Sequence, residues 1–156
     1  MNAEQRLLGR LLEEAYSIKT WHGPNLRGSI RGVTAKEASW RPGRGRHNIR
    51  EIAVHAAYWK YAVRRRLTGE KRGSFPLKGS NFFTLRGGEK AWKAEVALLD
   101  REHRALRRAV AGLPASHLHR KAPGSKYAWV RLIFGVACHD VYHAGQIQLL
   151  KRLQRS

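Results

Sequence analysis

Two histidines near the end of the chain have the spacing of a metal-binding pair. His139 and His143 are four residues apart, so on a helix their imidazoles project from one face, one turn apart. Two imidazoles so placed can bind one transition metal when a third ligand comes from another element. The alternative is a pair of core histidines whose ring nitrogens have hydrogen-bond partners. For a pair at this spacing we favour metal binding.

The apolar pattern around this pair predicts a helix with an inward stripe. Between Trp129 and Leu153, steps of four and three residues select Leu132, Val136, His139, His143, Gln146, Leu150 and Leu153. Such a stripe is typical of a helix in a bundle. Its ends are apolar and its middle is polar, and burying the middle costs free energy unless its polar groups are satisfied.

Two further residues of this helix are candidates for a catalytic role. Asp140 would either accept a hydrogen bond that orients an imidazole or face solvent. Gln146, one turn beyond His143, would hydrogen-bond either a ligand or the backbone. Cys138 lies off the stripe, and we interpret it as a small packing residue and not as a catalytic thiol.

Periodicity and helix-end signals predict the elements that must position these residues. Apolar spacing, capping boxes and helix-ending glycines and prolines place four helices near residues 3–20, 48–68, 89–112 and 127–154. Long glycine-containing connections separate the first helix from the second and the second from the third, and connections of that length are often functional. No stretch alternates like a strand. We therefore predict an all-α four-helix bundle that forms a single domain over residues 1–156.

The other helices supply further histidines. His55 and His103 lie on the apolar stripes of the second and third helices, and His55 is the natural third ligand. His22 follows the first helix in phase with its apolar face, so it would either lie over one end of the bundle, as a catalytic candidate that transfers protons, or be a solvated loop residue. The chain has only eleven acidic residues and no Glu-x-x-His sequence, which argues strongly against a carboxylate-bridged di-iron centre.

A mononuclear site with three histidines leaves the metal one or more open positions, as in catalytic centres. Zinc in such a site would lower the pKa of bound water to about 7. Imidazole does not discriminate sharply among divalent metals. We expect zinc or nickel first, with iron and manganese as alternatives.

The composition adds a second functional hypothesis. The chain carries 31 Lys and Arg against 11 Asp and Glu, a formal net charge of +20, which attracts polyanions such as nucleic acid. No recognition motif accompanies this charge. The alternative function is therefore a basic nucleic-acid-binding protein with a structural or vestigial metal site.

Other features of the composition bear on location. One cysteine permits no intramolecular disulfide, which fits a reducing compartment, and we expect a cytoplasmic protein. No apolar run has membrane-spanning length. The first residues are typical of an amphipathic helix and not of a signal peptide.

The nine residues from His139 to Ile147, HDVYHAGQI, resemble the C-terminal signature of the DinB superfamily. Several earlier segments are similar to one subgroup in the same order: Trp21–Leu26, Gly32–Thr34, His47–His55, Trp59 and Arg66–Glu70. The resemblance implies a four-helix bundle in which His55, His139 and His143 hold one divalent metal, and it gives His103 no ligand role. The chain departs from the subgroup at residues 48–50, where Arg50 replaces a usual Trp and is expected to alter the rim of the site.

Members of this family with known activities include thiol-dependent isomerases and S-transferases, and some are described as metal-dependent hydrolases. The resemblance therefore implies a small-molecule substrate and, for the transferase type, a thiol cofactor. It also implies a homodimer, since such bundles often pair. The aromatic residues around Trp40 and Phe82-Phe83 are the apolar surface that we expect to support pairing, and light scattering would test it.

We predict weak, sequence-independent affinity for duplex DNA. Binding would come from phosphate contacts alone, so the logarithm of the association constant should fall linearly as the logarithm of the salt concentration rises. Titrating two unrelated duplexes at two salt concentrations measures this. Tight binding to one sequence at physiological salt would instead place the nucleic-acid function first.

Overall fold

The computed structural model of the protein describes residues 1–156 and is all-helical. Its four long helices are α1 (Ala3–Tyr16), α4 (Ile49–Thr68), α5 (Glu89–Gly112) and α6 (Trp129–Leu153). Its shorter elements are α2 (Leu26–Ser29), α3 (Ala35–Ser39) and the 3-10 turn η1 (Ala115–His117). The only strand-like pairing is an isolated bridge between Lys121 and Ala128. The predicted fold class is confirmed, and no helix combines the length and apolar character needed to cross a bilayer.

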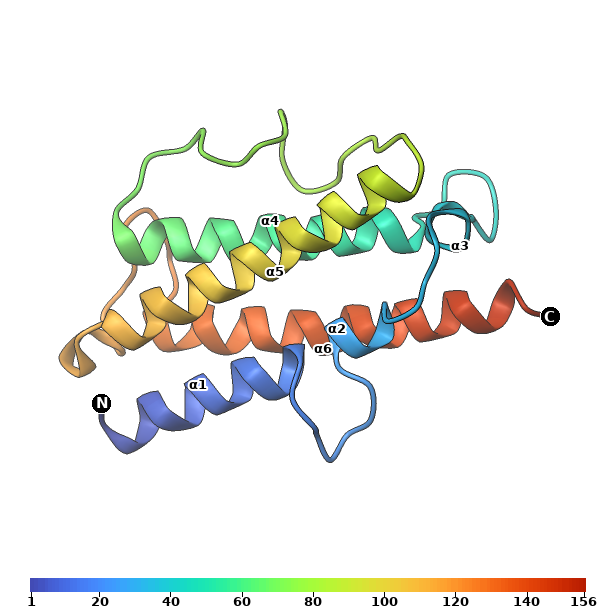
Figure 1. Cartoon of the computed structure of the whole chain (residues 1–156). Helices are drawn as coiled ribbons and strands as arrows, with labels where there is room; N and C mark the ends of the chain where they lie inside the picture. Colours follow the sequence, from blue (N-terminus) through green and yellow to red (C-terminus); the bar gives the residue numbers. More distant parts are fainter.

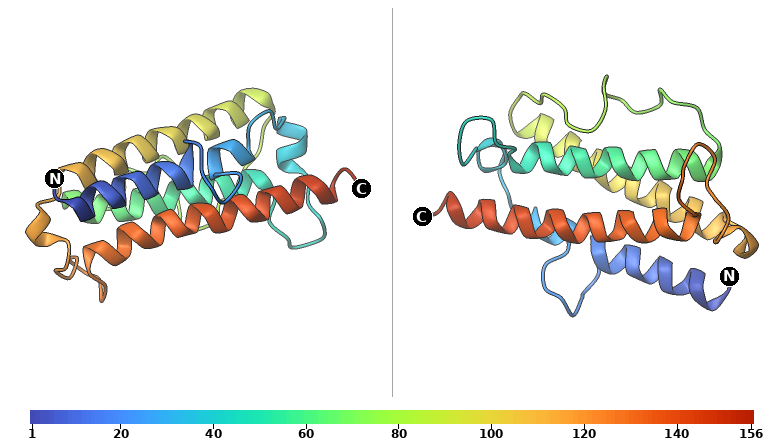
Figure 2. Two further views of the ribbon diagram at one scale, coloured as in Figure 1. Left: turned by 90° about the horizontal axis from the view of Figure 1, so that it is seen from below. Right: turned by 180° about the vertical axis from the view of Figure 1, so that it is seen from behind.

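The directions of the helices explain the long connections. In Figure 1, α4 and α5 run in the same direction, while α1 and α6 run in the opposite one. Residues 69–88 must therefore return along the length of the bundle before α5 can begin. The views in Figure 2 show α1 and α2 following one another along α6. The metal-ligand candidates lie on α4 and α6, which pack directly against each other.

Capping fixes where α4 begins and ends. The Asn48 side chain accepts a hydrogen bond from the Glu51 backbone N–H, and Glu51 reciprocates, which is the predicted capping box. At the other end Gly69 adopts a left-handed conformation with φ of 73°, as a helix-ending glycine does. Almost every side chain between Ile49 and Val63 is buried, because α4 packs against α3, α5 and α6.

Helix α1 is shorter than predicted, and this changes the expected place of His22. The helix ends at Tyr16, because the chain then turns and the Asn25 side chain donates a hydrogen bond of 2.8 Å to the Ile18 carbonyl. The phase argument therefore stops before His22. Ile18 is 41% exposed, and His22 is exposed in the loop that follows.

The inward face of α6 is rotated from the predicted stripe. Its buried side chains are Trp129, Ile133, Val136, Ala137, Asp140, His143, Ala144, Ile147 and Leu150. Asp140, which was expected to orient an imidazole or to face solvent, is fully buried and forms an ion pair with Lys60 of α4, also fully buried. Cys138 is exposed, so its interpretation as a packing residue is wrong.

Arg50 is buried and does not lie at the rim of the site. Its side chain is 2% exposed and pairs with Glu95 of α5, with Nη2 2.7 Å from Oε1. It also donates to the carbonyls of Arg86 and Gly87, at 2.8 and 2.7 Å. Arg50 thus fastens the end of the 69–88 connection to α4.

The apolar surface expected to support pairing is largely covered. Phe83 is buried in the core, and Trp40 is partly buried and packs against the same core. The large exposed apolar side chains instead include four on α6: Phe134, Tyr142, Leu149 and Leu153. The homodimer stays a prediction, and α6 is the surface that light scattering of a Leu149→Lys variant would probe.

We predict that Lys60→Met destabilises the protein by about 3–5 kcal/mol, because it leaves the Asp140 carboxylate buried without its partner. The double variant Lys60→Met/Asp140→Leu should recover most of this loss, since it buries no charge. Urea unfolding measures both. Lys93→Met, at an exposed position, is the matched control, and a Lys60→Met protein as stable as that control would contradict the prediction.

Candidate metal centre

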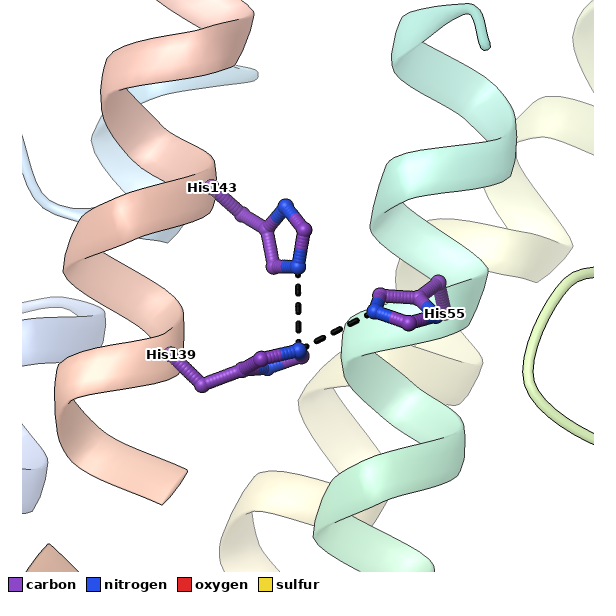
Figure 3. Close-up of side chains that lie close together, drawn as sticks. All are labelled: His55, His139 and His143. Carbon is purple, nitrogen blue, oxygen red and sulfur yellow. Dashed lines mark hydrogen bonds between the residues drawn. The ribbon is translucent and has the colours of Figure 1, made fainter. Parts of the chain in front are cut away.

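Three imidazoles from two helices point at one another inside the bundle. His55 projects from α4, and His139 and His143 project from consecutive turns of α6 (Figure 3). The Nε2 atom of His139 lies 3.0 Å from Nε2 of His55 and 2.9 Å from Nε2 of His143. The three candidate ligand atoms all lie within 4.8 Å of one another.

This geometry suits a single cation. Nitrogens bound tetrahedrally to zinc at about 2.0–2.1 Å stand roughly 3.3 Å apart, a few tenths of an ångström more than the two separations that His139 makes. No carboxylate or thiolate joins the cluster. All three donors are imidazoles, which bind zinc, nickel and iron.

Hydrogen bonds fix which nitrogen faces the centre in two of the three rings. Nδ1 of His55 donates to the Asn81 carbonyl at 3.0 Å, and Nδ1 of His143 donates to Oε1 of Gln146 at 2.7 Å. With Nδ1 carrying the proton, Nε2 keeps the lone pair that a metal requires. Nδ1 of His139 is buried and has no hydrogen-bond partner in the protein.

Burial keeps these imidazoles neutral. Burial, with a smaller effect of neighbouring histidines, lowers the pKa of His55 to about 4, against the hydrogen bond to Asn81, and that of His139 to about 3. The pKa of His143 is also lowered by burial, against the hydrogen bond to Gln146. Neutral rings are the form that binds metal, so at neutral pH the cluster is ready to act as a ligand set.

The 69–88 connection supplies contacts that sequence reasoning missed. Asn81 has a φ of 70°, a left-handed conformation that asparagine tolerates better than most residues. Besides accepting from His55, it accepts a hydrogen bond of 3.0 Å from Nε1 of Trp59 at its side-chain oxygen. Phe82 stacks on His55 with ring centroids 4.0 Å apart. The one sequence signal for these contacts is an asparagine, a residue that tolerates the left-handed conformation, within a connection rich in glycine.

A cavity of about 710 Å³ opens onto the three histidines. Both long connections contribute to its walls, together with α4 and α6; the lining includes Arg46, His47, Phe82, Tyr142, Gln146 and Leu149. No acidic side chain lines it. The cavity has the size of a small-molecule site.

The remaining sequence candidates lie in different places. Gln146 lines the cavity and contacts His143, whereas His22 does not line it. Asp140 faces Lys60 in the core. His103 is a core histidine outside the cluster: it stacks on Tyr16 with ring centroids 3.8 Å apart, and burial lowers its pKa to about 2.

His47 is a site residue that the periodicity argument could not find, because it precedes α4. Its ring stacks on the other face of Phe82, with centroids 3.7 Å apart, and Nδ1 lies 2.9 Å from Oε2 of Glu51. Burial acts to raise the pKa of Glu51. The hydrogen bonds from Arg41 and His47 outweigh burial and leave this pKa below its usual value. The ionised carboxylate therefore holds the His47 proton on Nδ1.

We predict that zinc affinity changes by less than threefold between pH 7 and pH 6 and falls as the pH approaches 4. Histidines with the ordinary pKa of about 6.5 would lose roughly 30-fold over the first interval, because three rings must give up protons. In the folded chain the lowered pKa values postpone this competition. Titration against a chromophoric chelator at each pH measures it, and a loss of 30-fold by pH 6 would show that burial does not protect the rings.

The same lowered pKa values determine how the stability of the metal-free protein depends on pH. The folded-state pKa values lie below the unfolded value, so the contribution to the free energy of unfolding is complete above about pH 6.5. It is lost as the pH falls from there through the folded values near 4 and 3. Urea unfolding of metal-free protein at pH 7 and pH 5 should show the lower stability at pH 5.

Comparison with known proteins agrees with the sequence and the fold. No curated protein and no solved structure matches the chain. One family model, described as the DinB superfamily, matches residues 20–147, which is most of the chain and includes all three clustered histidines. The protein therefore belongs to the DinB superfamily.

Proposed function

We propose that the protein is a metal-dependent enzyme in which His55, His139 and His143 hold one divalent ion. The observation that carries this is the convergence of three neutral imidazole nitrogens beside a cavity of about 710 Å³. Three protein ligands leave at least one position for another molecule, and the cavity gives a small substrate access to it. Zinc and nickel are the metals we expect first, and iron and manganese also suit the donors.

When bound, such an ion would supply Lewis acidity, polarising a substrate carbonyl or acidifying a bound water or thiol. The reaction types we propose are hydrolysis and thiol-dependent transfer or isomerisation. Thiol-dependent reactions would need a low-molecular-weight thiol as cofactor. Assaying the zinc-loaded protein with an activated ester, and separately with an electrophile plus thiol, distinguishes the types, and chelator-treated protein is the control for each.

His47 is our candidate for the proton acceptor. Its Nδ1 proton is held by Glu51, so Nε2 can take a proton from a group in the cavity. His22 was the sequence candidate for proton transfer, but it is exposed and outside this cavity. We do not assign Asp140 a proton-transfer role, because it is fully buried, pairs with Lys60 and does not line the cavity.

Gln146 acts through His143 in this proposal. Its Oε1 accepts from Nδ1 of His143, and its Nε2 donates to the Tyr142 hydroxyl at 3.1 Å. Gln146 is therefore a positioning residue for a metal ligand. Its lining of the cavity also leaves open a direct contact with substrate.

We predict about one zinc ion per chain for the wild-type protein after stripping, reconstitution and dialysis. Replacing His55, His139 or His143 with Ala should weaken binding at least tenfold and leave far less than one ion per chain. His103→Ala should keep the stoichiometry, although its stability should fall because the site is buried. Elemental analysis with circular dichroism of each variant measures both properties.

The exposed His119, which pairs with Glu4 and does not belong to the cluster, provides a control at a site where little is buried. His119→Ala should bind zinc like the wild type. Full zinc content in His55→Ala and His143→Ala, or loss confined to His103→Ala, would show that a different set of residues binds the metal.

A further inference from the structure

A second cavity, of about 360 Å³, lies between α4 and α6 and is separate from the first in all its lining except His139. Most of its wall is apolar, with Trp59, Val63, Leu132, Phe134 and Val136. The polar groups of the wall are Arg66 of α4, Arg131 of α6, and Tyr127 just before α6. The cavity thus combines an apolar wall, two guanidinium groups and the ring of a metal-ligand candidate.

Neither guanidinium has a carboxylate partner. Arg66 and Arg131 are absent from all the ion pairs of the protein, whose acidic members are Glu4, Glu13, Glu14, Glu51, Glu70, Glu95, Asp100, Glu102 and Asp140. The two remaining acids, Glu37 and Glu89, hydrogen-bond to the backbone at Thr34 and Ala35. No acid lines the cavity, so both charges there are free to pair with a ligand.

One of the two guanidiniums is held in place. Arg131 lies over the ring of Tyr127, with its guanidinium carbon 4.5 Å from the ring centroid. Stacking of this kind restrains a guanidinium while leaving its N–H groups available to donate. Two guanidiniums around one small cavity match an anionic head group, which each can bind with charge-assisted hydrogen bonds.

We infer that this cavity binds an amphipathic organic anion, with its carboxylate or phosphate head at Arg66 and Arg131 and its apolar body against Trp59 and the α6 side chains. This rests on the proposed function and names the substrate class of that site, since His139 lines both cavities. A ligand that fills the second cavity lies against a metal-binding imidazole. A purely apolar ligand would leave two guanidiniums in the wall without partners, which the anion avoids.

The test compares four probes. Octanoate, octyl phosphate and neutral octanol share an eight-carbon chain, and acetate has the carboxylate without that chain. Calorimetric titration should show that octanoate or octyl phosphate binds the wild-type protein, with octanol and acetate at least tenfold weaker. The tighter of the two anions identifies the head group. Equal binding of octanol would show that the guanidiniums take no part, and equal binding of acetate would show that the apolar wall takes none; either result overturns the inference.

Variants separate this site from the general positive charge of the protein. Arg66→Gln and Arg131→Gln should each weaken binding of the anion about tenfold or more, as expected for losing a hydrogen bond between charged groups. The matched control is Arg65→Gln, which removes the same charge from the adjacent position of α4, outside both cavities. It should change affinity less than twofold, and an equal loss in this control would overturn the inference.

Repeating the titrations with and without zinc, and measuring zinc content on the same samples, separates the two proposals. Anion binding that depends on Arg66 in zinc-free protein supports the cavity assignment, even where zinc fails to bind and the metal-dependent function is refuted. Zinc binding without anion binding leaves the function standing and refutes the cavity assignment. If zinc-loaded Arg66→Gln binds octanoate like the wild type, the carboxylate binds the metal and not the arginines, which also refutes it.

Discussion

The meeting of three imidazole nitrogens at one point is the constraint on which the rest of the structure depends. Because His55 and His143 donate from Nδ1, both present a lone pair at Nε2, about 3 Å from Nε2 of His139. Like lone pairs repel, and a proton on His139 Nε2 can be shared only imperfectly between two acceptors. A cation would satisfy all three at once. The packing of α4 on α6 is what holds the three rings close together.

The topology supplies what the two helices alone cannot. Since α4 and α5 run in the same direction, the 69–88 connection has to pass along the bundle (Figure 1), and it supplies contacts to the site. Asn81 accepts a hydrogen bond from Nδ1 of His55, and Phe82 stacks on the His55 ring. Arg50 holds the far end of the same connection. A segment without regular structure thus contacts a candidate metal ligand directly.

Sequence reasoning predicted most of the fold because its signals are local. The caps of α4 and the apolar repeats each involve residues close in sequence, and the i, i+4 spacing of His139 and His143 is itself a helical contact. Sequence reasoning was wrong where a contact with a residue distant in sequence determines whether a side chain is buried. The steps of four and three residues passed through His139 and left Asp140 off the inward stripe, whereas its pairing with Lys60 of another helix accompanies its full burial. Asn81 likewise acts through its contact with His55, and His47 through its stack on Phe82, and neither contact joins residues close in sequence.

The Lys60–Asp140 pair also restricts how this protein can diverge. A substitution of either residue alone passes through an intermediate with one unpaired charge in the core, beside the helix turn that carries His139. Exchange of the pair for apolar residues therefore requires two nearly simultaneous changes, although the end state is itself stable. Neutral evolution should therefore rarely pass through the destabilised single-substitution intermediate. Among descendants of a common ancestor, these two positions are expected to be inherited together as a salt bridge or replaced together, with mixed combinations scarce.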